Sequence, residues 1–310
     1  MPKKLFQRYS LTIFILVLWE TIVKLGWVDQ TFLPSLEDCV EAIYTLSVKS
    51  FLFTHIMVTL VRVITGLFLA VIIAVPLAYV MGRLLPEFFQ RTESLLRIFS
   101  LINPYCLFPL FIVFFGSGET PKIAVLTWVS LWPIFFNSLA GLKNIDPILL
   151  KTAKSLSVGP FSTFSKIILP GSLPSIFNGI RLGVEMSFFI LIAAEMTGAT
   201  AGLGWIIHNA GALNQVNRIY GAGICVVVLG VLLNRFAIFI QNGLCFWKEE
   251  LDPLTGVIGG DPKARFSTTK LTIVVAGFLL VLIVGAYEII TAERRLNDPT
   301  VIPEYRVWTE

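Results

Sequence analysis

The sequence predicts an all-α integral membrane protein with about six core transmembrane helices, short helices on the cytoplasmic side and a seventh helix near the C-terminus. Three observations predict this class. Hydrophobic residues form 55% of the chain, charged residues form 14%, and the mean hydropathy is +0.80. Several apolar runs reach the ~20 residues that cross a bilayer. Basic residues are concentrated in alternate connecting segments, which is typical of multi-pass proteins.

The composition also excludes several kinds of function. A net charge of +4 over 310 residues does not indicate a nucleic-acid partner, and it fits loops that lie against anionic membrane lipid. The four cysteines form no CxxC pair and no metal-binding spacing. The two histidines, His55 and His208, belong to no HExxH pattern. We therefore expect no metal site and no catalytic site in this chain.

Residues 1–50 are expected to form a first transmembrane helix and an amphipathic segment. The apolar run 11–18 follows a basic start, as in a signal peptide, but no small-x-small cleavage site follows it. Apolar character continues to Trp27, which predicts an uncleaved helix. Between residues 29 and 50, one helical face collects the apolar residues of an otherwise mixed segment, which predicts a helix on the outer surface: Leu36, Val40, Ile43 and Leu46.

Residues 51–247 form the expected core. The second span is expected to bend at Pro76, and a charged loop over 83–93 connects it to the third. A glycine-rich hairpin over 115–121 makes the third and fourth spans antiparallel neighbours. The second to sixth spans are expected over about 54–81, 94–115, 121–142, 174–196 and 220–244.

Residues 248–310 form a linker, an additional apolar run over 271–290 and a tail. The linker contains two Asp-Pro steps and a pair of glycines. The run has ~20 residues, enough to span. Basic residues are more frequent in segments on the same side as the N-terminus than in the opposite loops, which predicts a cytoplasmic N-terminus. Arg294, Arg295 and Arg306 fit this rule poorly if 271–290 spans the membrane.

A polar interval, KTAKSLSVGPFSTFSKIILPGSLP, begins at Lys151 between two long apolar segments. Its pattern predicts two short helices that meet at a turn over 157–160. The second is expected to end at Leu169, because a proline disfavours helix for the residue before it, and Pro174 is expected to begin the next span. The same charge bias assigns this interval to the cytoplasm, where a soluble partner would bind it.

This interval resembles the EAA motif of binding-protein-dependent ABC importer permeases. Lys151, Thr152 and Ala153 align with the EAA triplet, Ser157 with its glycine, and residues 167–170 with its hydrophobic-Leu-Pro end. The flanking stretches LPGSLPSIFNGIRLG, LIAAEMTGATAGLGWII and PLFIVFFGSGETPKI are similar to the branch that imports nitrate, bicarbonate, taurine and aliphatic sulfonates. The resemblance covers about residues 10–247 and includes several motifs in the family's order.

The resemblance implies a non-catalytic subunit of the bacterial inner membrane. Two permease copies, as a homodimer or pseudo-dimer, pair with cytosolic ABC ATPase subunits, and a periplasmic or lipid-anchored binding protein delivers the substrate. The chain has no G-x-x-x-x-G-K-[ST] loop, so ATP and Mg²⁺ are used by the partner ATPase and this chain binds no cofactor. The cytoplasmic coupling segment is 143–173, and its implied ATPase-coupling residues are Lys151, Thr152, Ala153, Leu156, Ser157, Gly159, Leu169 and Pro170.

Two of these residues depart from the family pattern. Lys151 replaces an acidic residue, and Ser157 replaces a glycine that would let the turn approach its partner closely. One interpretation is a partner ATPase that supplies a compensating acidic residue. The other is drift at a tolerant surface position.

Polar residues inside the apolar spans are the candidates for the translocation pathway or gate, because unpaired charge in hydrocarbon is expensive. Arg181 and Glu185 lie one helical turn apart, so we expect either an internal ion pair or a Glu185 that faces the pathway. Glu195, near the outer end of the same span, has a gating or a packing role. Residues 198–207 suggest a short re-entrant or surface helix in the outer gate.

The other three candidates lie on earlier spans. Arg62 either lines the pathway or extends its side chain toward the outer interface. Asn103, which precedes Pro104, marks either a simple kink or a local unwinding that exposes carbonyl groups. Trp132 shares a helical face with Trp128 and either packs between helices or contacts substrate.

Three other functions are alternatives to import of a small anion or organosulfur compound. Import of a cyclic nutrient such as a pyrimidine-like compound is an alternative within the same family branch. A secondary carrier would have an inverted repeat with interrupted helices, and the sequence has no such repeat. A membrane-embedded enzyme would need clustered nucleophiles, bases or metal ligands, and the two histidines are far apart.

Overall fold

The computed structural model describes residues 2–29, 31–49, 51–245, 250–252, 256–258, 272, 276–277, 280–289 and 291. Nearly all of these residues are helical, as the sequence predicts. The described strands are a two-stranded antiparallel ribbon, β1 (Glu250–Asp252) and β2 (Gly256–Ile258), within the predicted linker.

Four helical stretches among the described residues are long and apolar enough to cross a membrane. They are α3 (Leu52–Tyr79) with a π-helical turn (Val80–Leu84), α6 (Glu119–Lys143), the continuous helix Pro160–Gly198, and α11 (Val216–Leu244). These confirm the spans predicted over 54–81, 121–142, 174–196 and 220–244. The first predicted span is helical as α1 (Pro2–Lys24), although it is not one of these four.

The centre of the fold is the close packing of α3, α6 and α9 (Leu169–Gly198). Glycines permit this packing: a methyl group on Gly66 would lie 2.6 Å from Cβ of Leu126, and one on Gly179 would lie 2.9 Å from Cα of Ile134. Lipid supplies little hydrophobic driving force between helices, so small residues that bring backbones together are favoured at such contacts. The helix α11 packs on the outside of α9.

The third predicted span is two helices. Helix α4 (Pro86–Ser100) and helix α5 (Pro104–Phe115) are bent by 89° at their junction, so of the two alternatives at Asn103 the simple kink is wrong. Pro104 disfavours helical geometry at Asn103, which has an extended backbone, and the Asn103 side chain accepts a hydrogen bond from the Tyr105 amide at 2.9 Å to cap α5. Much of the loop predicted over 83–93 is helical, because α4 begins at Pro86.

The predicted helix end at Leu169 is also wrong. Helix α8 (Pro160–Thr163), a π-helical turn (Phe164–Ile168) and α9 run on without a break through Pro170 and Pro174. In the π turn, the Leu169 amide donates to the Phe164 carbonyl five residues back. This wider turn lies directly before Pro170, where a proline ring would otherwise crowd the preceding turn.

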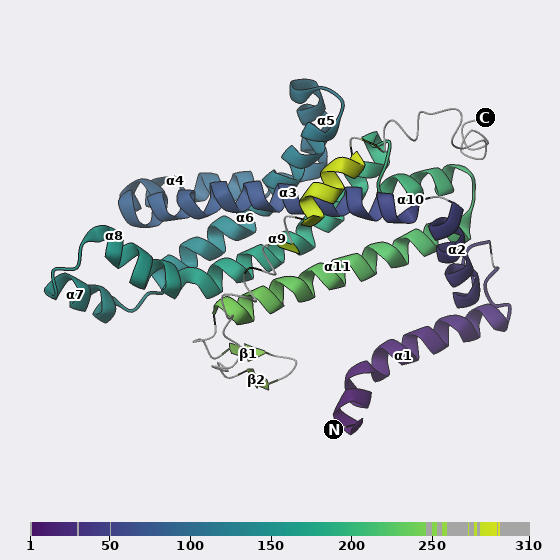
Figure 1. The fold of residues 1–310 in the computed structure, drawn as a ribbon, viewed down its shortest axis with the longest axis horizontal. Helices are drawn as coiled ribbons and strands as arrows, with labels where there is room; N and C mark the ends of the chain where they lie inside the picture. Colours follow the sequence, from purple (N-terminus) through teal and green to yellow (C-terminus); the bar gives the residue numbers. More distant parts are fainter. Residues whose placement is uncertain are drawn as a thin grey trace.

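The two ends of the bundle carry different elements, as Figure 1 shows. Helices α7 (Pro147–Ser155) and α8 lie at one end, and α2 (Leu36–Lys49) and α10 (Leu203–Ala212) lie at the other. The amphipathic helix predicted in residues 29–50 is confirmed as α2, but it buries Cys39, Ala42 and Leu46 largely against α11 while Val40 is exposed. Of the predicted seventh span, Leu280–Ile289 is helical, and part of the run lies outside the described residues.

Candidate functional site

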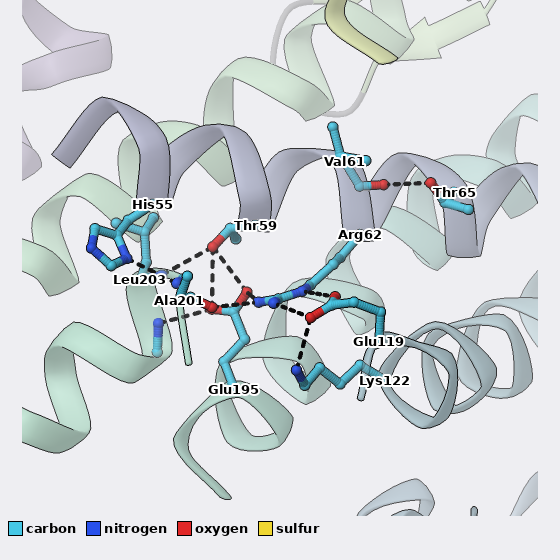
Figure 2. Close-up of polar contacts among 12 residues, drawn as sticks. His55, Thr59, Val61, Arg62, Thr65, Glu119, Lys122, Glu195, Ala201 and Leu203 are labelled. Carbon is cyan, nitrogen blue, oxygen red and sulfur yellow. Dashed lines mark hydrogen bonds and ion pairs between the residues drawn. The ribbon is translucent and has the colours of Figure 1, made fainter. Parts of the chain in front are cut away.

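A buried arginine lies at the centre of a polar network at the end of the bundle that carries α10 (Figure 2). The side chain of Arg62, on α3, is 1% exposed. Its Nε and Nη2 donate to the two carboxylate oxygens of Glu119 at 2.6 and 2.7 Å. Its Nη1 donates to Glu195 at 2.7 Å and to the Ala201 carbonyl at 2.7 Å. The expected extension of Arg62 toward an interface is therefore wrong: the guanidinium is held inside by two carboxylates.

The carboxylate of Glu195 connects three helices. It is fully buried near the end of α9 and accepts hydrogen bonds from Arg62, from the Thr59 hydroxyl at 3.0 and 3.1 Å and from the Gly204 amide at 2.9 Å. The Thr59 hydroxyl in turn accepts from the Leu203 amide at 3.0 Å. A buried carboxylate is tolerated only when it is paired and hydrogen-bonded. The contacts of Glu195 therefore join α3, α9 and α10.

The loop between α9 and α10 approaches this carboxylate so closely that it requires glycine. Gly202 has φ +132°, and a methyl group there would lie 2.5 Å from both carboxylate oxygens of Glu195. At Gly204 the added carbon would lie 2.7 Å from Cβ of Glu195. The Gly202 amide donates to Nδ1 of His55 at 2.9 Å, and the His55 ring stacks on Trp205 with centroids 5.4 Å apart. The predicted short helix after residue 198 is confirmed as α10.

The network opens onto a polar cavity on its other side. Glu119 lies in the first turn of α6, where the helix dipole favours a carboxylate, and its Oε1 accepts from Nζ of Lys122 at 3.0 Å. The Lys122 side chain is 3% exposed and Glu119 is about one-third exposed. Both line a cavity of about 410 Å³ together with Arg62, Gly118, Thr200 and Ala201. We call the linked side chains the distal network: His55, Thr59, Arg62, Glu119, Lys122 and Glu195.

Sequence reasoning found two members of the distal network, Arg62 and Glu195, but did not pair them. It missed Glu119 and Lys122, which read as loop charges beside the glycine hairpin. One signal could have identified these two residues: an acidic residue in the first turn of a helix, followed three residues later by a lysine. From the sequence, His55 was considered only as a possible metal ligand. Within the described ranges, no group of three or more His, Cys, Asp or Glu residues could hold a metal ion.

The predicted ion pair between Arg181 and Glu185 is not formed among the described residues. Nε of Arg181 instead donates to Asn234 on α11 at 3.4 Å. Glu185 is exposed on α9, on the same face as Met186 and Phe189. Within a single chain, this part of α9 is therefore an uncovered face that carries one carboxylate.

Asn103 and Trp132 lie apart from the distal network. Asn103 is exposed at the junction of α4 and α5, where it caps α5. Trp132 packs edge-on against Trp128 with ring centroids 5.2 Å apart, and it also stacks on Phe136. The indole nitrogens of Trp128 and Trp132 are buried, and neither has a hydrogen-bond partner within the described part of the chain.

The predicted coupling residues lie at the opposite end of the bundle, in a segment that we call the α7–α8 arm (Pro147–Ile168). Large apolar side chains project from it: Ile148 is 68% exposed, Leu156 is 72% exposed and Phe161 is 81% exposed. Ala153 is the buried residue of α7. The remaining predicted residues are exposed on the arm or half-buried at its base: Lys151, Thr152, Ser157 and Gly159 on the arm, and Leu169 and Pro170 at the base.

Ser157 occupies a backbone position that favours glycine for a different reason from the one expected. Its φ is +52°, in the left-handed region. The Ser157 amide donates to the Lys154 carbonyl at 3.1 Å, and the Val158 amide donates to the Ala153 carbonyl at 3.0 Å. This is a Schellman arrangement at the end of α7, where the left-handed residue is usually glycine. Local backbone geometry is therefore one reason for a glycine at this position, and close approach to a partner stays a prediction.

Comparisons with known proteins agree with this arrangement. A family model described as "Binding-protein-dependent transport system inner membrane component" matches residues 66–244. The taurine transport system permease protein of Escherichia coli (strain K12) is 29% identical over 243 residues, which cover 76% of this chain and 88% of that protein. The putative aliphatic sulfonates transport permease protein of Bacillus subtilis (strain 168) is 28% identical, over 77% of this chain and 86% of that protein.

Two further similarities extend the comparison. The nitrate import permease protein of Leptolyngbya laminosa is 28% identical over 62% of this chain and 68% of that protein. A chain from an inward-facing structure of the MetNI methionine ABC transporter matches with a TM-score of 0.55 at 20% sequence identity. That match covers 63% of this chain and 97% of the other, and it shows a shared fold.

The family match covers more than half of the chain and includes α4 to α11. Membership implies an ATPase and a substrate-binding protein as partners, and a multi-pass position in the inner membrane. The chain belongs to the family of binding-protein-dependent transport system inner membrane components and is a non-catalytic permease subunit of an ABC importer.

Proposed function

We propose that this permease imports a small sulfonate, nitrate or a similar anion, and that the α7–α8 arm transmits ATP-driven movement to it from a separate cytosolic ATPase. The observation that carries this proposal is the arm itself. It holds large exposed apolar side chains on a segment that also carries Lys151, Lys154 and Lys166. Such a patch marks an interaction site, and its lysines favour the cytoplasmic side.

The connection between the arm and the rest of the protein supports a lever. Residues Pro160–Gly198 form one helical stretch of 39 residues, which begins in the arm and ends beside the distal network. A displacement of the docked arm therefore passes along α9 toward Glu195, three residues before the end of this stretch, instead of being absorbed by a loop. The distal network would then respond as an outer gate that alternates between two packed arrangements.

The exposed face of α9 supports a second copy of this chain as partner. Glu185, Met186 and Phe189 lie on this face, halfway along a membrane-spanning helix. A carboxylate that faces lipid there is strongly disfavoured, so a protein or aqueous surface covers it. Two copies that meet near this face enclose a pathway in which Glu185 contacts water or substrate.

The class of substrate rests on the named relatives and on two uncommitted donors. Relatives carry the names taurine, aliphatic sulfonate and nitrate, all of which present anionic oxygens. The indole N–H groups of Trp128 and Trp132 have no partner within the described ranges and suit such oxygens as donors. ATP and Mg²⁺ bind to the partner ATPase, and no cofactor is required in this chain.

The test is reconstitution of the permease with its ATPase and binding protein in liposomes. We expect ATP hydrolysis to rise when the binding protein is loaded with taurine, an alkanesulfonate or nitrate, and uptake to require ATP. Stimulation by a pyrimidine-like compound, with none by these anions, would reassign the substrate class. Uptake driven by an ion gradient without ATP would contradict the importer itself.

A further inference from the structure

The C-terminal helical segment Leu280–Ile289 lies beyond the part of the chain that matches the family, which ends at residue 244. In Figure 1 this segment, in yellow, lies across α3 near α10. The sequence offers no basis for choosing between a tail anchor and a site for another subunit. The contacts of this segment supply that basis.

The segment packs against α3 through a glycine. Gly285 is buried, and a methyl group built on it would overlap the Val61 side chain. One turn along, the carboxylate of Glu288 accepts a hydrogen bond from the Thr54 hydroxyl at 3.2 Å. Close glycine contacts are a usual way for membrane helices to associate. The segment therefore docks on α3 through close packing at Gly285 and one side-chain hydrogen bond.

The same face of the segment reaches the distal network. Ile289 packs with Val58 and Ala201, which are 1% and 3% exposed. It also lines the 410 Å³ cavity into which Arg62 and Lys122 face. On the opposite face, the large apolar residues of this segment are exposed, as expected for a surface in contact with lipid: Leu280, Ile283 and Tyr287.

We propose that the C-terminal helix is an intramolecular clamp, which docks on α3 of its own chain and closes the cavity of the distal network on that side. Val61 lies beside Arg62 in sequence, so the clamp presses on the turn of α3 that presents the guanidinium to Glu195 and Glu119. Its occupant is this chain, and no additional subunit is needed to cover that face of α3.

Disulfide crosslinking in native membranes tests the docking directly. In the full chain with its four cysteines replaced by serine or alanine, the pair Val58→Cys and Ile289→Cys is expected to form an intramolecular disulfide. The control pair, Val58→Cys with Ile283→Cys, places the second thiol on the exposed face and is expected to form none. A dimer-sized product, or equal yields from both pairs, would overturn the proposal.

A second experiment asks whether docking shields the cavity. The Val58→Cys thiol is modified with a water-soluble maleimide, alone and combined with Gly285→Leu or with Gly277→Leu. Among the described residues, an added Cβ atom meets nothing within 4 Å at Gly277, but it meets Val61 at Gly285. We expect Gly285→Leu to raise the modification rate about tenfold, because overpacking shifts the helix away from α3, and Gly277→Leu to leave it unchanged.

Equal modification rates in the Gly285→Leu and Gly277→Leu proteins would contradict the clamp. Neither experiment requires a substrate or an ATPase, so a failure here is distinct from a failure of the proposed transport function. The crosslinking pair contains no glycine substitution, and therefore it still decides the question if Gly285→Leu does not fold.

Discussion

The two ends of this permease differ in the burial of their side chains: the distal end buries paired charges, and the other end exposes large apolar side chains. At the distal end, Arg62 and Glu195 are almost completely buried and their charges are satisfied by side chains and backbone groups from α3, α6, α9 and α10. At the other end, the α7–α8 arm exposes Ile148, Leu156 and Phe161. Packing is open there as well, since a largely apolar cavity of about 510 Å³ lies between the arm and α3.

This difference separates what stabilises the chain from what it offers to a partner. Removing a charged member of the distal network leaves its buried charges unbalanced, so such a change affects stability first. Shortening an exposed apolar side chain on the arm removes few contacts within the chain, so such a change affects assembly first. The predictions below test this separation, in order of decreasing expected effect.

Glu195→Gln is expected to have the largest effect. The amide cannot neutralise Arg62, and breaking a buried ion pair destabilises by about 3–5 kcal/mol. Thermal unfolding in detergent measures the loss. The control is Glu93→Gln, which breaks an exposed pair with Arg97 on α4 and is expected to cost at most about 0.5 kcal/mol. Equal losses from both variants would show that the distal network does not hold the fold together.

Gly202→Ala is expected to destabilise the protein by about 1–3 kcal/mol, because a methyl group meets the Glu195 carboxylate in an unfavourable backbone conformation. The matched control is Gly116→Ala. Gly116 also has a positive φ, +78°, but no atom of the described part of the chain lies within 4 Å of the added carbon. A smaller loss of stability in Gly116→Ala than in Gly202→Ala, measured by the same unfolding assay, would separate the cost of the steric clash from the cost of backbone strain.

Phe161→Ala is expected to leave the unfolding temperature nearly unchanged, because the side chain is 81% exposed. Binding of the ATPase is expected to weaken about tenfold or more, as for truncation of an aromatic residue at the centre of an interface. Affinity for the purified ATPase measures this. Phe68→Ala is the control, since Phe68 is exposed on α3 outside the arm. Comparable weakening by both variants would contradict docking through the arm.

Ser157→Gly is expected to stabilise the end of α7 by about 1 kcal/mol, because an L-residue with φ near +52° is disfavoured relative to glycine. The amide of Val158, which donates to the Ala153 carbonyl, reports this locally. Its hydrogen exchange is expected to slow by about fivefold. Unchanged or faster exchange would show that glycine is not preferred at this position.

Lys151→Glu is expected to have the smallest effect. The side chain is exposed, so folding stability is expected to stay the same. If the ATPase supplies a compensating acidic residue, its affinity falls by at most about fivefold, the range of a surface ion pair. Unchanged affinity and transport would assign Lys151 to drift at a tolerant position.

Much of the helical layout followed from apolar runs and punctuating residues. Four predicted spans correspond to α3, α6, α9 and α11, because long apolar runs bounded by glycine, proline and charge have few other solutions in a membrane. The failures are local: the break between α4 and α5, and the continuity through Pro170 and Pro174. Both depend on backbone adjustments, a cap at Asn103 and a π turn before Pro170, which no periodicity encodes.

The candidate site was less predictable, for a geometric reason. Arg62, Glu119 and Glu195 come from three helices. A single sequence does not indicate which charged residues that are far apart along the chain come into contact in the fold. Arg181 and Glu185 are close in sequence, so an ion pair was one of two alternatives for them, but Arg181 donates to Asn234 on α11, a partner that sequence spacing does not reveal. The C-terminal clamp depends on contacts of the same long-range kind, between residues 285–289 and α3, so the sequence did not predict it either.

Ligand-stimulated ATP hydrolysis by the reconstituted complex, compared between the unmodified permease and the Leu156→Ala, Phe161→Ala double variant, tests the central claim most directly. The account predicts that the variant unfolds at the same temperature but loses the stimulation produced by the loaded binding protein. Full stimulation with an intact fold would contradict transmission through the α7–α8 arm.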